Sequence, residues 1–464
     1  MDYAALTELT RAAALRFLES LPDRPVRATA SLDDLRTSLG GALPEHPSDP
    51  RALVDELARA LEPGLVASAG PRYYGFVTGG VLPVALAAEW LTATWDQNTF
   101  NHVMSPAASV VEEVCTAWLL ELLRLPRGAG VGFVTGGQMA NFTCLCAARD
   151  EVLRRAGVAL EEIGLAEAPP ITVFVAEQAH VTIHSALRML GIGKRRVVSV
   201  PSDAHGRLVA SALAAALRGR REPLIVCAQA GNVSTGGFDP LGEIVAAARE
   251  AGAWVHVDGA FGLWAAVHPE LRQLVAGHEG ADSWAVDAHK WLNVAYDSGI
   301  AIVADREAHR RALRVGSAAY LVTSGAQAHD GSDWVPESSR RARAFAIYAA
   351  LRGLGREGLI ELIGRCCALA RRMAAGLARA ADATIVNDVV LNQILVRFDA
   401  ATPEAGDVRT RAVIERVQRD GVCWAGGSVY AGRAVMRISI SNWSTSEDDI
   451  DRSSDAIVRC FRSL

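Results

Sequence analysis

The sequence predicts an α/β protein whose larger part is a mainly parallel, doubly wound sheet. Short apolar segments alternate with helical runs between about residues 81 and 303, and alternation on this scale is typical of parallel strands joined by crossover helices. The chain has 464 residues, of which 50% are hydrophobic and 21% charged. This size and composition suit a well-packed protein of two or three domains.

The first part of the chain, residues 1–80, is predicted to form helices interrupted by prolines. Ala4–Leu21 and Asp49–Leu61 have helical apolar spacing, and prolines follow both. These helices have few core residues of their own, so they need another surface to pack on. We expect residues 1–80 to form a helical dimerisation segment.

The central part, residues 81–345, is expected to be the large, ligand-binding domain. Helical runs such as Met139–Arg155 and Leu241–Ala251 separate its strands. The strand candidates are Gly132–Thr135, Ile171–Ala176, Arg196–Val200, Leu224–Ala228, Trp254–Asp258, Ser283–Asp287 and Gly299–Ala304.

The last part, residues 346–464, has the outline of a smaller C-terminal α/β domain. A long helical run, Ile347–Leu377, is followed by strand-like Val389–Phe398 and Val435–Ser441, with a helix between them. Irregular Ser317–Pro336, rich in small residues, is the segment that we expect to be a mobile loop.

Charge and composition exclude several kinds of partner. The net charge of −5 gives no electrostatic reason to expect binding to nucleic acid or to an anionic membrane. No apolar stretch approaches the roughly 20 residues that span a bilayer, and the acidic amino terminus does not resemble a signal peptide. The eight cysteines lack the paired spacing of a zinc site, so we expect reduced thiols, no metal and a cytoplasmic location.

Lysine is rare in this chain. Of the 47 basic residues only two, Lys194 and Lys290, are lysines. Arginine serves well in ion pairs but cannot lose its proton and attack a carbonyl group. Lys290 follows the strand candidate Ser283–Asp287, where a Schiff-base lysine would lie. Taken alone, it is as well explained as an ordinary surface lysine.

Other polar groups also follow predicted strands, where ligands of parallel sheets gather. Asp258 could keep a pyridine nitrogen protonated, or it could be an ordinary turn aspartate. The glycine turn in Thr135-Gly-Gly-Gln-Met-Ala-Asn could bind a phosphate at a helix start, although, taken alone, a tight turn without a ligand is the better explanation. His180 could stack on an aromatic ligand or assist proton transfer, or be a loop histidine. His289, directly before Lys290, could equally be structural.

The glycine turn, His180, Asp258 and Lys290 occur in this order at successive strand ends, and the set resembles the pyridoxal 5'-phosphate (PLP)-dependent group II decarboxylases. This family includes the aromatic-L-amino-acid, glutamate and histidine decarboxylases. The likeness extends over nearly the whole chain. It rests most strongly on His256-Val-Asp-Gly-Ala-Phe-Gly and Asp287-Ala-His-Lys-Trp, with Pro71-Arg-Tyr-Tyr-Gly-Phe-Val-Thr and Met436-Arg-Ile-Ser-Ile-Ser-Asn near the ends.

The resemblance implies a PLP-dependent transferase fold of type I, like aspartate aminotransferase, and a homodimer with active sites at the subunit interface. It further implies that Lys290 forms an imine with PLP, that Asp258 pairs with the pyridine nitrogen, and that His180 stacks on the ring. The other implied cofactor contacts are Ala260 on the opposite ring face, Asn232 near the ring, and Gly137, Gln138, Asp287 and His289 around the phosphate. Thr78, Phe100 and Arg437 are the implied substrate contacts, and an internal ion pair would explain Arg437 equally.

The expected reaction is decarboxylation of an L-amino acid to an amine and carbon dioxide. Tyr73, Tyr74 and Phe100, among others, suggest an aromatic or bulky apolar substrate, although core packing would explain these residues equally. Aromatic family members usually carry a tyrosine in the mobile loop, and here Gly331 or a neighbour stands at about that position. His329 could replace it as the proton donor. Otherwise oxygen could divert the reaction to an aldehyde, ammonia and peroxide. A protein of this fold that binds ligands without turnover is the third hypothesis, and the reactive amine of Lys290 argues against it.

Two further departures affect the cofactor site. Asp287 stands where the family usually has asparagine, and it places a carboxylate near the phosphate unless one of the two is protonated. Asn232 stands in place of a usual threonine.

Overall fold

The computed structural model describes residues 2–314 and 329–464, and internal contacts divide the chain into two compact units. Unit 1 comprises Met1–Thr78, Arg371–Val386 and Leu395–Leu464, and unit 2 comprises Gly79–Ala370 and Asn387–Ile394. The division expected at residues 80 and 345 stays a prediction, as does the dimerisation role of residues 1–80. Most of the loop expected at Ser317–Pro336 lies outside the described residues.

Unit 2 is built on a seven-stranded sheet in the order β1-β7-β6-β5-β4-β2-β3. Only β7 runs antiparallel to its neighbours, and every other pairing is parallel. Apart from the edge strand β3, all strand residues are buried, as in a sheet covered on both faces. The strands are β1 (Gly130–Val134), β2 (Thr172–Ala176), β3 (Val197–Val200), β4 (Leu224–Gln229), β5 (Trp254–Asp258), β6 (Ser283–Asp287) and β7 (Gly299–Val303).

The predicted α/β class and mainly parallel sheet are therefore confirmed. All seven strands expected between residues 132 and 304 are present, each within two residues of its expected bounds. Crossover helices follow β2, β3 and β4 along the chain, as doubly wound sheets require.

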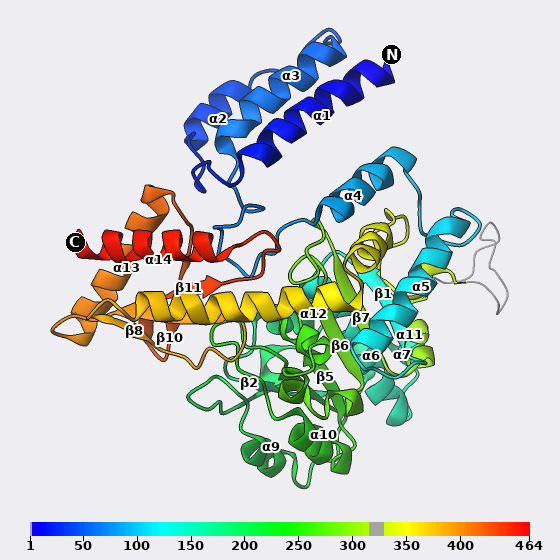
Figure 1. Ribbon diagram of the computed structural model, residues 1–464. Coiled ribbons are helices and arrows are strands. Elements are labelled where there is room, and N and C mark those ends of the chain that lie inside the picture. Colours follow the sequence, from blue (N-terminus) through cyan, green and yellow to red (C-terminus); the bar gives the residue numbers. More distant parts are fainter. Residues whose placement is uncertain (1, 315–328) are drawn as a thin grey trace. The chain divides into compact units, whose positions relative to one another are not determined.

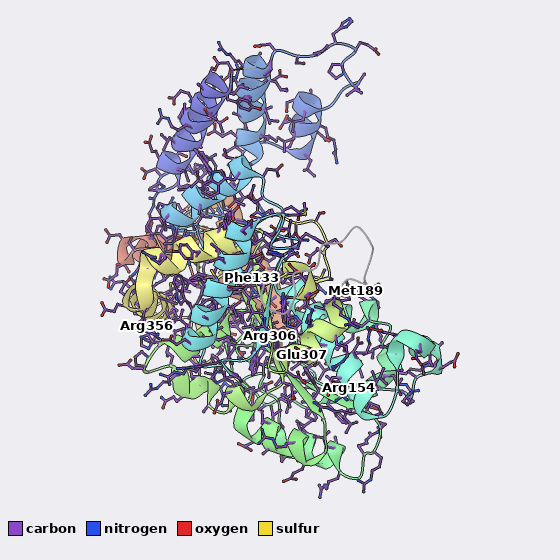
Figure 2. The ribbon with its side chains drawn as sticks, turned by 90° about the vertical axis from the view of Figure 1, so that its right-hand side faces the viewer. Phe133, Arg154, Met189, Arg306, Glu307 and Arg356 are labelled. Carbon is purple, nitrogen blue, oxygen red and sulfur yellow. The ribbon has the colours of Figure 1, made fainter. Side chains whose placement is uncertain are left out.

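The helices of unit 2 cover this sheet. Helix α6 packs against β6 and β7 and also contacts α8 and α11; Figure 2 marks these helices by Arg154, Met189 and Arg306. Helices α9 and α10 pack on each other (Figure 1). The helices are α4 (Pro83–Trp95), α5 (Pro106–Leu122), α6 (Gly137–Arg155), α7 (Leu160–Glu167), α8 (Val181–Met189), α9 (Ala210–Leu217), α10 (Leu241–Glu250), α11 (Arg306–Leu313) and, shared with unit 1, α12 (Ala344–Leu377).

Unit 1 combines three amino-terminal helices with a four-stranded sheet in the order β10-β11-β9-β8. Local sequence explains several of its helix ends. Asp49 caps α3 just before Pro50, and Ser446 with Asp449 forms a capping box on α14. Its elements are α1 (Tyr3–Ser20), α2 (Leu32–Leu39), α3 (Pro50–Leu61), β8 (Ala383–Ile385), β9 (Gln393–Phe398), α13 (Pro403–Asp420), β10 (Gly426–Tyr430), β11 (Arg433–Ser439) and α14 (Glu447–Arg462).

None of the helices in the described part of the chain combines the length and apolar character that crossing a bilayer requires. Within the same residues, no cluster of three or more His, Cys, Asp or Glu side chains is arranged to hold a metal ion. All eight cysteines are free and buried.

Candidate active site

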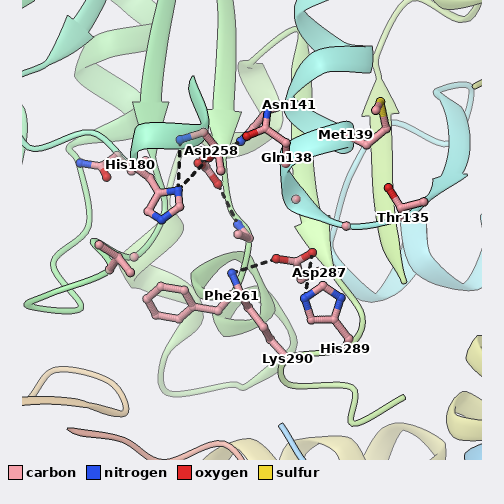
Figure 3. Close-up of a pocket in the computed structure, with 17 residues that line it drawn as sticks. Thr135, Gln138, Met139, Asn141, His180, Asp258, Phe261, Asp287, His289 and Lys290 are labelled. Carbon is pink, nitrogen blue, oxygen red and sulfur yellow. Dashed lines mark hydrogen bonds and ion pairs between the residues drawn. The ribbon is translucent and has the colours of Figure 1, made fainter. Parts of the chain in front are cut away.

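The carboxyl ends of four parallel strands of unit 2 surround a cavity of about 320 Å³ (Figure 3). Thr135 and the glycine turn follow β1, Gln229 ends β4, Asp258 ends β5 and Asp287 ends β6. Because these strands are parallel, their last residues meet at one edge of the sheet. The cavity thus brings together groups that are far apart in the sequence, from Thr135 through His180 to Lys290.

Lys290 is held at the cavity by an ion pair with Asp287. The Lys290 Nζ lies 2.8 Å from Asp287 Oδ2 and 5.9 Å from the centroid of the Phe261 ring, and the lysine side chain is only 18% exposed (Figure 3). The amine is therefore partly shielded from water but still faces the cavity. Its pairing with a carboxylate distinguishes it from an ordinary surface lysine.

The backbone of Lys290 is fixed by its neighbours. Asn293, which is fully buried and has a positive φ of 51°, donates from its side-chain amide to the carbonyl oxygens of Lys290 and Trp291. Its side-chain oxygen accepts a hydrogen bond from the Gly80 amide at 2.7 Å. A Cβ added to Gly79 would lie 2.0 Å from the Lys290 carbonyl oxygen, so only glycine permits this approach. The lysine therefore projects from a rigid turn.

The turn between β1 and α6 has the features of an anion site. Helix α6 begins at Gly137 without a side-chain cap, so its first amide groups are available to an acceptor. The turn packs closely on its surroundings. A Cβ on Gly299 of β7 would lie 2.5 Å from the Gly136 Cα, and one on Gly137 would lie 2.9 Å from Asp287 Oδ2. The glycines thus allow the turn to lie against β7 and Asp287.

Both carboxylate oxygens of Asp258 accept hydrogen bonds. Oδ1 accepts from the Ala260 amide and Oδ2 from the side-chain amide of Asn141, each at 3.2 Å. Asn141 in turn pairs through its Oδ1 with His256 Nε2 at 2.9 Å. Burial lowers the pKa of His256 to about 4, against the opposite effect of Asp258, so this imidazole is neutral at neutral pH. These contacts set the orientation of the Asp258 carboxylate at the cavity.

His180 is placed by the helix that follows it. It is the N-cap residue of α8, where its Nδ1 accepts the Thr182 amide at 3.4 Å and pairs with the Thr182 hydroxyl at 2.8 Å. Because Nδ1 accepts a backbone hydrogen bond, it carries no proton in this arrangement. The ring is therefore a neutral imidazole beside the cavity (Figure 3).

Three buried polar atoms of residues that line the cavity have no hydrogen-bond partner in the described structure. They are Gln229 Nε2, Asp287 Oδ1 and His289 Nδ1. Burial, opposed by the effect of Asp287, lowers the pKa of His289, which favours its neutral form. Buried polar groups rarely lack partners in folded proteins. The cavity is therefore suited to a polar ligand.

The sequence model of the pyridoxal-dependent decarboxylase conserved domain matches residues 33–399, most of the chain. The chain belongs to the pyridoxal-dependent decarboxylase family. It is a PLP-dependent carboxy-lyase, and its cofactor is PLP. The resemblance stated from the sequence motifs is thereby confirmed.

Curated relatives in this family are similar over nearly their whole length. The chain is 27% identical to phenylacetaldehyde synthase of Arabidopsis thaliana, with 94% of this chain and 90% of the relative covered. It is 28% identical to tryptophan decarboxylase 1 of Oryza sativa subsp. japonica (92% and 87% covered) and 25% identical to the aromatic-L-amino-acid decarboxylase of Bacillus atrophaeus (93% and 90%). Relatives of similar identity thus form either amines or aldehydes.

Solved structures of the family share this fold. The Oryza sativa tryptophan decarboxylase structure with PLP and tryptamine has a TM-score of 0.92 at 25% identity and covers 100% of this chain and 99% of its own. The Rhodiola rosea 4-hydroxyphenylacetaldehyde synthase structure has a TM-score of 0.88 at 25% identity, with 100% and 99% covered. The predicted type I fold is therefore confirmed.

The residues around the cavity fit PLP. The Lys290 amine at the cavity matches the aldehyde of PLP, and the open amide groups at the start of α6 match its phosphate. The buried polar atoms without hydrogen bonds match the polar substituents of its ring. One feature opposes this match, because the Asp287 carboxylate borders the turn that would receive the phosphate. Its charge has to be compensated when an anion binds there.

Most of the predicted cofactor residues line the cavity. Gly137, Gln138, His180, Asp258, Ala260, Asp287, His289 and Lys290 all do so, whereas Asn232 does not. The Asn232 side chain is used within its own loop, where its oxygen accepts the Ser234 and Thr235 amides and its nitrogen donates to the Gln178 carbonyl. Its neighbours Gly231 and Val233 line the cavity instead.

The three predicted substrate residues do not line the cavity of unit 2. Thr78 and Arg437 belong to unit 1, and burial lowers the pKa of Arg437. Phe100 belongs to unit 2, where its carbonyl accepts the Ser332 amide. Their contact with substrate stays a prediction.

His329, the predicted substitute proton donor, also lies outside the cavity lining. It is buried, and its Nε2 pairs with Glu112 Oε2 at 2.9 Å while its ring stacks on Trp334. A Cβ on Gly331 would lie 2.0 Å from Arg340 Nη2, so this conformation has no room for a side chain there.

Sequence reasoning missed Asn141, Gln229 and Phe261, which line the cavity. Asn141 and Phe261 are part of the motifs that carry the family resemblance, and Gln229 directly follows the predicted strand Leu224–Ala228, so position alone could have drawn attention to them. What the sequence lacks is the direction in which their side chains point.

Proposed function

We propose that this enzyme decarboxylates an aromatic L-amino acid to the corresponding amine and carbon dioxide. The observation that carries the proposal is the meeting of Lys290, Asp258 and His180 at one cavity beside the uncapped start of α6. The aromatic substrate is supported by relatives named as tryptophan, tyrosine and aromatic-L-amino-acid decarboxylases.

In this proposal each part of the cavity holds one part of PLP. Lys290 would hold the cofactor covalently, and the amides of Gly137 and Gln138 would bind the phosphate, with His289 and Asp287 beside it. Asp258 would face the pyridine nitrogen, and His180 and Ala260 would flank the ring. Gln229, with its unpartnered amide nitrogen next to Asp258 in the sheet register, is an additional contact.

The bound cofactor supplies an electron sink for the bond that breaks at the substrate α-carbon. The chain contributes position and charge. Asp258 presents a fixed carboxylate, and the neutral His180 flanks the ring without adding a charge. The partly buried amine of Lys290 can hold or release a proton close to the reacting carbon. Phe261 lines the cavity and limits the access of water.

We also propose that the enzyme is a homodimer. Helices α1, α2 and α3 bury none of their residues, although they carry apolar side chains such as Leu32 and Leu53. Helix α4 leaves Trp90, Leu91 and Trp95 more than 40% exposed. Apolar surface on this scale favours burial against another chain. Sedimentation velocity at micromolar concentration should give twice the 49.3 kDa chain mass, and a monomer there would contradict the proposal.

Aldehyde formation is the second candidate, and a specific observation favours it. Gly331, which stands near the position of the usual loop tyrosine, is packed so closely that no side chain fits, and His329 is occupied by Glu112. Two relatives, phenylacetaldehyde synthase and 4-hydroxyphenylacetaldehyde synthase, carry names of this reaction type.

One experiment separates these candidates. The purified enzyme with PLP is incubated with tryptophan, tyrosine, phenylalanine, glutamate and leucine, and carbon dioxide, amine, aldehyde and peroxide are quantified. One amine per carbon dioxide from an aromatic substrate supports decarboxylation, whereas aldehyde with peroxide supports the second candidate. Turnover of glutamate alone would contradict the substrate class. The Lys290→Ala variant is the blank.

A further inference from the structure

A line of buried hydrogen bonds runs from the sheet interior to Asp258. Trp254 Nε1 lies 2.9 Å from Ser283 Oγ, which lies 3.0 Å from His256 Nδ1. His256 Nε2 pairs with Asn141 Oδ1 at 2.9 Å, and Asn141 Nδ2 donates to Asp258 Oδ2 at 3.2 Å. Trp254, Ser283 and His256 are completely buried, and Asn141 is 1% exposed. Water therefore does not compete with these bonds.

The two ends of this line, an indole that only donates and a carboxylate that accepts, set the direction of its bonds. Ser283 Oγ accepts from Trp254, and the remaining partner of this buried hydroxyl in the described residues is His256 Nδ1. The hydroxyl could accept from His256 as well, but its own hydrogen would then be buried without a partner, so it is directed to His256 Nδ1. A neutral imidazole carries one hydrogen, and here it has to be on Nε2. His256 then donates to Asn141 Oδ1, which turns the amide nitrogen of Asn141 toward Asp258.

The side-chain amide of Asn141 is also linked to His180, through the hydroxyl group of Thr182. Asn141 Nδ2 lies 3.2 Å from Thr182 Oγ1, so its second hydrogen is directed to that hydroxyl. The hydrogen of Thr182 is then available to His180 Nδ1, 2.8 Å away. The Thr182 backbone amide donates to the same nitrogen, which independently requires His180 Nδ1 to be an acceptor. Both contacts therefore require His180 Nδ1 to be a hydrogen-bond acceptor.

We propose that Trp254, Ser283 and His256 are positioning residues that fix the polarity of this line, so that Asn141 always presents donors to Asp258 and Thr182. With the opposite polarity, Asn141 would turn its oxygen toward the Asp258 carboxylate, and two acceptors would face each other. The Trp254 indole therefore contributes, through Ser283 and His256, to the orientation in which Asn141 faces the cavity. This role goes beyond the proposed function and rests on it only in naming Asp258 and His180 as groups that face the cofactor.

The protonation state of His256 supports this direction. Burial lowers its pKa to about 4, although Asp258 acts in the opposite direction. The ring is consequently neutral throughout the range in which such an enzyme is assayed, and the tautomer, not the charge, is the variable.

The tautomer can be measured directly. Full-length enzyme with PLP, labelled with ¹⁵N in histidine, gives two-bond ¹H–¹⁵N spectra in which the two neutral tautomers have distinct ring nitrogen shifts. The His256 signals are assigned by their loss in His256→Asn. We expect the Nε2–H tautomer between pH 6 and 8. The Nδ1–H tautomer or an imidazolium would overturn the proposal, and this measurement requires no folded variant beyond the assignment.

The Trp254→Phe variant tests whether the Trp254 indole helps to set the direction of these hydrogen bonds, and Trp284→Phe is its matched control. Both indoles are fully buried, but Trp284 Nε1 donates to the His278 carbonyl and does not join this line. Without Trp254 the Ser283 oxygen loses its donor, so donating to His256 no longer satisfies more groups than accepting from it. The Nδ1–H tautomer should therefore become detectable, and PLP should bind about fivefold more weakly, the effect of one hydrogen bond. Trp284→Phe should change neither quantity. An unchanged tautomer in Trp254→Phe, or equal effects of both variants, would refute the role of Trp254.

The outcome is independent of the reaction assay. A protein that shows the Nε2–H tautomer but decarboxylates no amino acid would refute the proposed function and leave this inference intact. An active enzyme with the Nδ1–H tautomer would do the reverse.

Discussion

Asp287 Oδ2 lies 2.8 Å from Lys290 Nζ, while the other oxygen of the same carboxylate is buried beside the glycine turn, 3.6 Å from His289 Nε2 and without a hydrogen bond. One side chain is therefore the counter-ion of the proposed cofactor amine and a negative neighbour of the proposed phosphate site. Both relationships oppose the binding of an anionic aldehyde.

Asp287→Asn should bind PLP at least tenfold more tightly than the wild type at pH 8. The substitution removes the repulsion between carboxylate and phosphate and the ion pair that Lys290 has to give up, and two charges about 4 Å apart interact by about 4 kcal/mol at an effective dielectric constant of 20. Fluorescence titration of the cofactor-free protein with PLP measures the change. Asp305→Asn, which removes a carboxylate charge outside the cavity and keeps an N-cap side chain on α11, should leave the affinity unchanged. Unchanged or weaker binding in Asp287→Asn would show that the carboxylate is already neutral when PLP is bound.

Lys290→Arg should reduce kcat by at least about 1,000-fold, because arginine keeps its charge and cannot bond to the cofactor aldehyde. Borohydride treatment of the holoenzyme followed by intact mass measurement should show a reduced adduct in the wild type and none in the variant. Lys194→Arg is the matched control. Lys194 is exposed in a short 3₁₀ turn, Lys194–Arg196, and its variant should keep full activity and the adduct. An adduct on Lys290→Arg would contradict the assignment.

Gly299→Ala should weaken PLP binding at least tenfold and should have little effect on the stability of the seven-stranded sheet. Its Cβ would lie 2.5 Å from the Gly136 Cα, which forces the turn at the start of α6 to move. Gly128→Ala is suitable for comparison because a Cβ at Gly128 meets nothing within 4 Å. Equal affinities of the two variants, measured by equilibrium dialysis against PLP, would exclude the turn as the phosphate site.

Two buried histidines should make the fold sensitive to acid. Burial lowers the pKa of His256 and of His309 to about 4, from 6.5. The stability that each neutral ring contributes is present above pH 6.5 and is lost as the pH falls toward 4, because the unfolded chain binds the proton first. The full loss is about 3 kcal/mol for each ring.

Urea unfolding of the wild type and of His309→Gln at pH 7.5 and pH 5 tests this dependence. His309 lies outside the cavity, where its Nε2 pairs with the Trp334 carbonyl, so its variant tests the titration apart from cofactor binding. The variant should lose less stability than the wild type between the two pH values. The wild type has to be compared with a variant because Asp239 has the opposite effect. Burial raises the pKa of Asp239 to about 7, so the stability that its protonated form contributes is lost as the pH rises. Equal losses in both proteins would contradict the prediction.

Local patterns were sufficient for the large sheet. The seven strands of unit 2 are short, apolar and bounded by helices, so each was visible in the sequence. Helix α2 was missed because its eight residues are mostly polar and exposed, and its capping box of Ser31 and Asp34 is its main signal. Edge strands β8 and β10 were missed for a similar reason, since both are incompletely buried.

Some side-chain contacts at the site could not be predicted from the sequence, and the physical reason differs from that for the missed helix and strands. Parallel topology was enough to expect His180, Asp258 and Lys290 at one edge of the sheet, whereas Asp287 was expected only from the family resemblance. The side-chain partners of Asn232 depend on how residues 178 and 231–237 fold around it, which no local pattern reveals. The line from Trp254 to Asn141 joins β5, β6 and α6, so it exists only in the folded chain.

The place of Lys290 within the cavity has a practical consequence for a chain with so few primary amines. Besides the α-amino group, an acylating reagent has only two targets, one exposed at Lys194 and one inside the cavity. Counting the labels on the intact protein would therefore report cavity occupancy as a difference of one, without isotopes, digestion or a chromophore. Candidate inhibitors could be ranked in this way by the protection that they give to a single nitrogen atom.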